Sequence, residues 1–323
     1  MKNKLILVAL FGLFNTFLFA QTADADKIQI LSKPKLIAKL PKLAISQITI
    51  KYKLASTAKT IGKDKRTGVV AGAKLSAYLE TTDGELTSND FQEITDAFYV
   101  YFQKKLQSNN IQTVDWSTIT ATEFYKSEEP KEDKKTSRNE NVWVKSTANN
   151  GNVLYGGGLG FSFLKAKRAA KFCEELGASA GFFYLTVDFA DLLIDLDVNQ
   201  STTQTMFTST TTRSKKYTWA VNPIVKIDSP LYGLNQYDYT MLTDEKLNAE
   251  MSIVSEPIQG TLKYADSATE DASKLKNSLW AFRKEMQPVV IQTTKEKYKA
   301  AAKEALEKYA DAFVAKAIQL KKK

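Results

Sequence analysis

The segment from Phe161 to Val198 constrains the fold of this chain more than any other, because its pattern changes from helix to strand across one glycine. Apolar residues recur at steps of three and four as far as Leu176, which is the spacing of one buried face of a helix. Gly177 then ends the helix, as glycine does where a left-handed backbone conformation is needed. From Gly181 to Phe189 apolar and polar residues alternate, which predicts a strand. A helix followed at once by a strand is typical of a layered α/β fold.

The alternation within this segment changes phase near its end. The odd-numbered positions are apolar up to Phe189, whereas the even-numbered positions are apolar from Leu192 to Val198. A period-two pattern shifts parity only through an extra residue or a break in the strand. We therefore expect a bulge or bend at Ala190–Asp191.

Acidic residues lie on both sides of this expected break, at Asp188, Asp191, Asp195 and Asp197. The spacing from Asp195 to Asn199 is also that of the first ligands in a calcium loop. Gln200, however, replaces the turn glycine of such a loop, and Met206 stands where its bidentate glutamate belongs. We interpret the aspartates as the solvated face of a strand and assign no metal ligand. The alternative is a carboxylate-dependent hydrolase, or a calcium-binding envelope protein, that uses the Asp188–Asp197 cluster.

The remaining patterns extend the α/β prediction along the chain. Alternation predicts strands at residues 48–54, 73–79, 111–116, 217–227 and 252–264, and a stripe of large apolar residues predicts a helix at residues 91–106. Residues 56–72 are polar and contain glycine, so we expect a loop there. A threonine-rich strand at residues 202–212 is expected to turn at Arg213–Lys216. Thr120 and Glu123 have the spacing of a capping box, which predicts a short helical turn.

Two amphipathic helices are predicted at the C-terminus. Ser267 and Glu270 have the spacing of a capping box, and apolar residues follow at steps of four and three as far as residue 286. Pro288 ends this first helix, and Thr293 opens a second helix whose apolar stripe runs to Leu320. We expect the two helices to bury their stripes against each other or against the sheet; a coiled coil with a partner helix is the alternative.

The N-terminus has the three parts of a secretory signal peptide. Lys2 and Lys4 are followed by an apolar run from Leu5 to Phe14, and Ala20 supplies a small residue before the expected cleavage site. The run is too short to span a bilayer. We expect no transmembrane helix after the signal is removed.

The predicted fold class is thus α/β (α+β), a mixed sheet with packed helices followed by a C-terminal pair of amphipathic helices. The predicted organisation is a signal peptide at residues 1–20, an N-terminal arm at 21–42, an α/β domain at 43–265 with a mobile charged loop at 127–141, and a C-terminal helical region at 266–323.

Composition removes several kinds of chemistry. The chain contains no histidine, which excludes Ser-His-Asp and Cys-His catalysis and histidine-ligated zinc. The single cysteine, Cys173, lies among apolar helical positions and is expected to be a buried structural residue. Gly156–Gly160 precedes a helix but lacks the Gly-Lys-Ser/Thr of a phosphate loop, so we interpret it as a turn rather than a cofactor site. The formal charge of +9 comes from scattered lysines without interleaved aromatic residues, so no nucleic-acid partner is expected.

The order of the predicted elements resembles the TolB N-terminal and CsgG curli-export families. The resemblance rests on the strand Ile45–Leu54, on the helix that ends at Leu106 before Ile111–Val114, and on Phe172–Ala178 leading into Gly181–Val187. It implies an exported, non-enzymatic α/β domain that acts at the cell envelope through protein contacts. Some members of these families form rings that make an outer-membrane pore, so the resemblance also implies assembly of this kind.

Together these observations predict an exported bacterial cell-envelope protein that is a binding or assembly component and not an enzyme. No catalytic, cofactor-binding or metal-binding residue is assigned. The expected location is the periplasm or the periphery of the outer membrane. The expected partners are envelope proteins, with a homo-oligomer as a further form of assembly.

Overall fold

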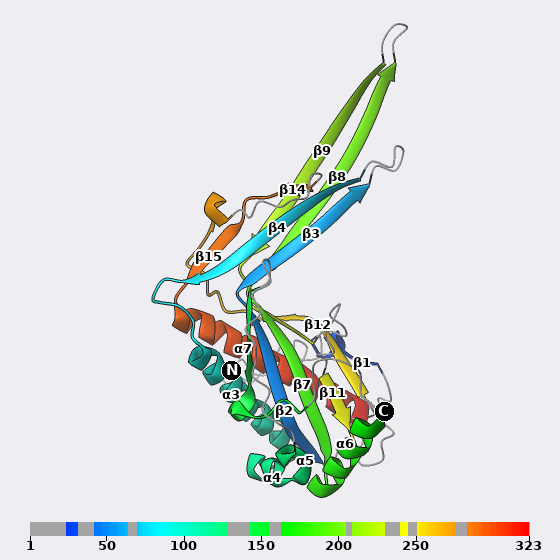
Figure 1. The fold of residues 1–323 in the computed structure, drawn as a ribbon, viewed down its shortest axis with the longest axis vertical. Helices are drawn as coiled ribbons and strands as arrows, with labels where there is room; N and C mark the ends of the chain where they lie inside the picture. The colour runs from blue at the N-terminus through cyan, green and yellow to red at the C-terminus, as the bar shows by residue number, and fades with distance from the viewer. Residues whose placement is uncertain are drawn as a thin grey trace, which may run out of the picture.

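The computed structural model describes residues 24–31, 42–63, 70–127, 142–154, 163–204, 209–229, 240–244, 251–274 and 283–322. The predicted signal peptide, nearly all of the charged loop at 127–141 and the glycine loop Gly156–Gly160 lie outside these residues. The chain forms a body of helices packed on a sheet, and two hairpins project from one end of this body in the same direction (Figure 1).

The body is built on a mixed sheet that confirms the predicted α/β class. Its strands are β1 (Ile28–Ile30), β2 (Lys42–Lys53), β5 (Gln112–Thr113), β6 (Trp143–Thr147), β7 (Ser179–Asp188), β10 (Lys226–Ser229), β11 (Thr240–Thr243) and β12 (Met251–Gln259). β2 and β7 lie parallel at its centre, and β10 and β11 lie between β7 and β12, antiparallel to both. The segment predicted as an N-terminal arm contributes β1, which pairs with β12.

Helices cover both faces of this sheet. α3 (Ser88–Ser108) and α7 (Lys295–Lys321) pack on one face. The other face packs against α6 (Phe163–Leu176) and the short helices α4 (Trp116–Ala121) and α5 (Glu123–Lys126), and it also buries Cys173 as expected. Within the described residues, no helix is long and apolar enough to cross a membrane.

Three phenylalanines form the centre of the first face. Phe102 on α3, Phe183 on β7 and Phe313 on α7 contact one another edge to face, with ring centroids 5.0 to 5.4 Å apart. All three side chains are buried. The edge-to-face arrangement places the positive edge of one ring against the negative face of the next. This cluster joins the C-terminal helix to the body, as predicted for the second C-terminal helix.

Local signals mark the ends of α3 and α6, and Gly177 ends α6 as the sequence predicts. Thr87 caps α3 through a capping box with Asp90, and Asn110 leaves the helix with a φ of 58°. Gly177 follows α6 with a φ of 55°, in the left-handed region that glycine adopts at low cost. Gly84, in the turn before α3, has a φ of 106°.

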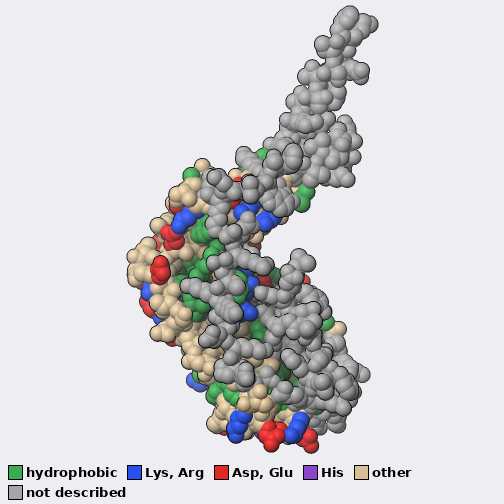
Figure 2. Space-filling view, viewed as in Figure 1, with side chains coloured by type: hydrophobic (Ala, Val, Ile, Leu, Met, Phe, Trp, Pro, Cys, Tyr) green, Lys and Arg blue, Asp and Glu red, His purple; other side chains and the backbone are tan. Residues whose placement is uncertain are grey.

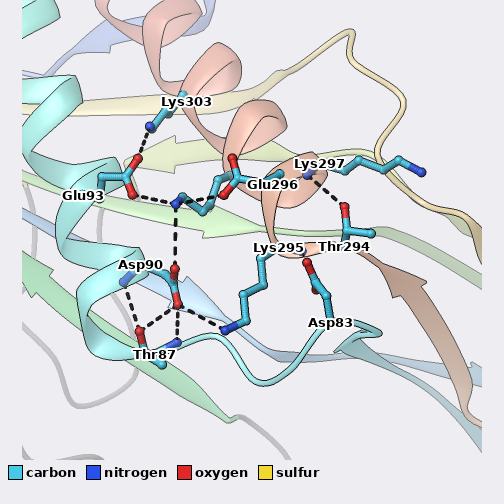
Figure 3. A network of polar contacts seen from close by, with 10 residues as sticks. Asp83, Thr87, Asp90, Glu93, Thr294, Lys295, Glu296, Lys297 and Lys303 are labelled. Atoms are coloured by element: carbon cyan, nitrogen blue, oxygen red, sulfur yellow. Dashed lines mark hydrogen bonds and ion pairs between the residues drawn. The ribbon is translucent and has the colours of Figure 1, made fainter.

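An ionic network joins the N-terminal turns of α3 and α7 (Figure 3). The Nζ of Lys299 lies 2.6 Å from a carboxylate oxygen of Glu93, 3.3 Å from one of Glu296 and 3.8 Å from one of Asp90. Lys303 binds the other oxygen of Glu93 at 2.6 Å. The Lys299 side chain is only 9% exposed, so these ion pairs are less screened by solvent than those at an open surface. The network therefore links the first turns of α7 to those of α3.

The two projecting hairpins come from separate parts of the chain. The first is β3 (Ala55–Lys63) with β4 (Val70–Thr81), and the second is β8 (Asp191–Gln204) with β9 (Ser209–Asn222). β14 (Arg283–Glu285) and β15 (Val289–Thr293) pair with β4 in parallel, and β13 (Ser267–Glu270) pairs with β15. β8 lies against both β3 and β4, and the β8–β9 hairpin reaches further from the body (Figure 1).

The inner part of β8–β9 carries an apolar face. Leu192 lies opposite Val221 and Ile194 lies opposite Trp219, so their side chains share one side of the hairpin. Leu192, Val221 and Trp219 pack against the main core. The predicted break at Ala190–Asp191 is confirmed, because the chain leaves the body sheet there and begins a separate two-stranded sheet.

Two predictions about the hairpins were wrong. The predicted loop at residues 56–72 is strand in its described parts, since β3 extends to Lys63, β4 begins at Val70, and the two pair along the whole of β3; residues 64–69 are not described. The turn of the second hairpin is not at Arg213–Lys216, because these residues lie within β9, where Lys216 is opposite Asp197. β3 and β9 consist largely of threonine, serine, lysine and small residues. Such strands lack the apolar alternation by which a strand is recognised in a sequence.

The prediction of the first C-terminal helix was also wrong for the residues that the structure describes. Residues 267–270 form β13, a 3₁₀ turn follows at Ala272–Lys274, and residues 283–285 form β14; residues 275–282 are not described. Ser267 is therefore not a helix cap, and its backbone pairs with Gln292 of β15. Pairing with a distant strand outweighs the weak local helix preference. Similarly, Thr122 rather than Thr120 caps the short helix α5.

Candidate functional site: a charged sheet face beneath two hairpins

A group of charged side chains from distant segments lies on one face of the body sheet, where the hairpins leave it. We call this group the charged junction and define it as Lys53 and Ser56 of the β2–β3 segment, Asp188 and Asp191 on either side of the β7–β8 break, and Lys226 and Asp228 of β10. Asp188 lies directly opposite Lys226 in the β7–β10 pairing, and Asp228 lies opposite Thr186. The residues come from three distant segments because β2, β7 and β10 are neighbours in the sheet.

Asp188 is the centre of the charged junction. Its side chain is 6% exposed, and its Oδ2 accepts hydrogen bonds from Lys53 Nζ at 2.6 Å and from Ser56 Oγ at 3.2 Å. Its Oδ1 faces the backbone N–H of Ala190 at 3.4 Å. One buried carboxylate therefore holds the start of the first hairpin to the strand from which the second hairpin begins. A hydrogen bond to a charged group contributes about 1.5–3 kcal/mol.

A second ion pair joins the two ends of the β8–β9 hairpin. Lys226, which follows β9, lies with its Nζ 2.6 Å from Oδ1 of Asp191, the first residue of β8. Both side chains are partly exposed, at 16% and 29%. The pair therefore closes the base of the hairpin. Because both side chains are partly buried, solvent screens the two charges less than it would at an open surface.

Asp228 is a charged residue of this site that the sequence analysis missed. Burial raises the pKa of Asp228, the charge of Lys53 opposes this rise, and the charge of Asp188 adds to it. The Thr186 hydroxyl also donates a hydrogen bond to the carboxylate. The available sequence signal was the alternation of Lys226 and Asp228 with the apolar residues Val225 and Ile227, which marks one charged face of a strand.

Two further lysines on the same sheet face point elsewhere. Lys51 of β2 lies opposite Lys145 of β6, and their Nζ atoms lie over the Trp143 ring at 4.9 and 5.3 Å from its centroid. This is the geometry of a cation–π contact. Lys51 and Lys145 are thus directed to the β6 side of the face, away from β10.

The aspartates of the predicted Asp188–Asp197 cluster do not converge. Asp188 and Asp191 bind different lysines, while Asp195 and Asp197 are exposed along β8. Among the described residues, no group of three acidic, cysteine or histidine side chains is arranged to hold a metal ion. Two carboxylates of the charged junction, Asp188 and Asp191, are each hydrogen-bonded to a lysine of another strand, which is an arrangement that fixes strands relative to one another.

The strand edges of the β8–β9 hairpin form the second part of the candidate site. In the part of the chain that the structure describes, β8 and β9 pair only with each other, over fourteen residue pairs. The two edges differ in charge. β8 contains three aspartates and no lysine or arginine, whereas β9 contains Arg213, Lys215 and Lys216 and no acidic residue.

The surface of the body has no such asymmetry on the face shown in Figure 2, where the described acidic and basic side chains are interspersed. The β8–β9 hairpin therefore differs from this face of the body in the separation of charge between its two strands.

Comparison of the chain with protein-family models, with curated proteins and with solved structures finds no match.

Proposed function

We propose that this protein is a non-enzymatic binding and assembly component of a bacterial cell envelope, exported by its N-terminal signal, and that the β8–β9 hairpin is its contact surface. The observation that carries the proposal is the hairpin itself, a two-stranded sheet in which, as far as the structure describes the chain, β8 and β9 pair only with each other over fourteen residue pairs. Two-stranded sheets are marginally stable in water, and open edges are templates for strand addition.

The charges of the two strands favour a second copy of the chain as the partner. The acidic edge of β8 in one copy complements the basic edge of β9 in another, whereas like edges repel. Pairing of unlike edges is a head-to-tail contact, and it leaves one acidic and one basic edge free for further copies. Complementary charge mainly sets the choice of partner and the association rate, while the backbone hydrogen bonds of the added strand give affinity.

A charge-exchange experiment tests this proposal. In the first variant, Asp195→Lys and Asp197→Lys make both edges basic; in the second, Lys215→Glu and Lys216→Glu make both edges acidic. We expect the wild type to associate, each variant alone to remain monomeric, and an equal mixture of the two variants to associate again. Light scattering coupled to size exclusion measures each state.

Two controls sharpen the result. Exchange of a surface pair on the body, Lys171→Glu with Glu123→Lys, keeps a solvent-exposed ion pair and should leave association unchanged. High salt should weaken wild-type association, because exposed charges are screened within about 10 Å at 0.1 M ionic strength. Association of either variant alone at the wild-type level would refute the role of the edge charges.

The envelope location is tested separately. We expect the mature protein to begin near Gln21, and mass spectrometry of the protein isolated from its source cell measures this. An intact N-terminus from Met1 would contradict export through a cleaved signal.

A further inference from the structure

The lysines of α7 fall into two groups along the helix. The first five, from Lys295 to Lys308, each have a carboxylate oxygen within 3.9 Å of Nζ. The last acidic residue of the helix, Asp311, lies 2.9 Å from the Nζ of Lys105 on α3. From residue 312 to residue 323 the chain contains four lysines and no acidic residue. The end of α7 is therefore basic, whereas the lysines of its earlier turns are paired.

Three described lysines define this basic end. We call Lys316, Lys321 and Lys322 the C-terminal lysine cluster. Lys321 and Lys322 are exposed, and Lys316 is partly exposed. Within the part of the chain that the structure describes, no carboxylate pairs with any of the three. The cluster therefore presents positive charge to whatever lies outside this end of the helix.

The cluster lies far from the hairpin sheet. α7 begins directly after β15, and its 27 residues give it a length of about 40 Å. The chain ends on the body, away from both hairpins (Figure 1). A contact made by the cluster therefore leaves the hairpins free.

The apolar side chains of the last turns are occupied within the protein. Ala317 is buried, and Ile318 and Leu320 pack against the main core. This end of α7 thus has charge to offer but no free apolar stripe, which an amphipathic helix needs to insert between lipid chains. A contact here is electrostatic and lies at a surface.

The directions of the lysines favour a broad anionic surface over a single acidic segment. Successive residues of an α-helix are turned by about 100°. Lys321 and Lys322 therefore leave the helix on different sides from each other and from Lys316. A linear acidic peptide meets one side of a helix, whereas the mobile headgroups of a membrane can meet all three charges.

We propose that the C-terminal lysine cluster is a membrane-surface contact that binds the phosphate groups of anionic phospholipids. Clusters of lysine at the end of a segment are attracted to such membranes by their negative surface potential. The contact holds the body at the membrane and leaves the hairpins available for protein partners. This inference rests on the proposed envelope location, because export brings the protein beside membranes, but it does not use the edges of the β8–β9 hairpin.

Vesicle flotation tests the contact. The protein is produced without residues 1–20, since an attached apolar signal would bind lipid by itself. One set of vesicles contains equal parts of phosphatidylglycerol and phosphatidylcholine, and the other contains phosphatidylcholine alone. We expect binding to the anionic vesicles only, and we expect salt to weaken it because exposed charges are screened within about 10 Å at 0.1 M ionic strength.

The test variant combines Lys316→Gln, Lys321→Gln and Lys322→Gln. Each lysine near an anionic membrane strengthens binding by about five-fold, so the loss of three should weaken it by roughly 100-fold. Arginine at the same three positions keeps the charge and should restore binding. These lysines also complement the negative end of the helix dipole, so circular dichroism and urea denaturation check that the glutamine variant remains folded.

A matched control separates the cluster from net charge. Lys104→Gln on α3, Lys126→Gln on α5 and Lys263→Gln after β12 together remove three exposed lysines elsewhere, and this variant should bind as the wild type does. Equal losses in the two triple variants would show that binding follows net charge and would overturn the proposal. So would wild-type binding to both kinds of vesicle, or to neither.

Two competitors distinguish other sources of negative charge. Inorganic phosphate should displace no more protein than sodium chloride of equal ionic strength, and stronger displacement would indicate a site for free phosphate instead. Soluble polyglutamate that binds the wild type more tightly than the vesicles do would indicate an acidic protein partner and would also overturn the lipid assignment. The charge-exchange and mass-spectrometry experiments are done without vesicles, so the proposed function and this inference fail separately.

Discussion

The phenylalanine cluster gives a quantitative test of how α7 is held to the body. Phe313 is 1% exposed, and its ring contacts the rings of Phe102 and Phe183 at centroid distances of 5.4 Å. Replacing a buried phenylalanine by alanine removes its transfer free energy and leaves a cavity, at a cost of about 3–5 kcal/mol. Because domains are stable by about 5–15 kcal/mol, Phe313→Ala removes a large part of the total.

A double-mutant cycle assigns part of this loss to the ring contact. If Phe102→Ala and Phe313→Ala act on one shared contact, the double variant should be less destabilised than the sum of the single variants. We expect a coupling of about 0.5–1.5 kcal/mol, the range for an aromatic pair beyond its buried area.

The assay is urea denaturation followed by circular dichroism, with the free energy of unfolding taken from the midpoint at constant slope. Val100→Ala is the matched control, because Val100 lies on the same helix, two residues before Phe102, but is 46% exposed. It should change stability by less than about 0.5 kcal/mol. A loss below about 1 kcal/mol for Phe313→Ala, or additive single variants, would refute the packing of α7 against α3 and β7.

Three further predictions concern single residues. Lys299→Met removes the buried partner of the α3–α7 network and should cost about 1.5–3 kcal/mol in denaturant unfolding. The matched change Lys297→Met, which breaks a half-exposed ion pair, should cost less than about 1 kcal/mol, and equal losses would contradict a special role for burial. Gly177→Ala should cost about 1–2 kcal/mol by the same assay, because φ is 55° there although no atom obstructs the new side chain. Hydrogen bonds from Thr87 lower the pKa of Asp90 below 3.8, so its contribution is present above that pH and is lost as pH falls. The stability gap between wild type and Asp90→Asn should therefore narrow on acidification, and a constant gap would contradict this.

The elements that the sequence predicted correctly are those whose signal is local. The helix at residues 91–106 and the helix–glycine–strand unit around Gly177 have an apolar period that matches their geometry, and their caps lie within a few residues. The break at Ala190–Asp191 was also predicted, because a change of parity is a property of one strand and not of its neighbours.

The charged junction needed the tertiary structure. Lys53, Asp188 and Lys226 are far apart in the chain, and only the order of β2, β7 and β10 in the sheet brings them together. The sequence identified Asp188 as part of an acidic cluster with its neighbours along the strand. The structure instead pairs it with a lysine from β2, and it adds Asp228, which has no acidic neighbour in the sequence.

The hairpins and the C-terminal strands show the physical limit of the sequence signal. By itself the sequence determined where apolar side chains must be buried, because burial requires a periodic stripe. It did not determine the pairing of β3 with β4 or of β13 with β15, because polar strands are held by backbone hydrogen bonds that any side chain permits. Backbone N–H and C=O groups find their partners only after distant segments have been brought side by side. The tertiary structure therefore decided where Ser267–Glu270 pairs and how the two hairpins leave the body.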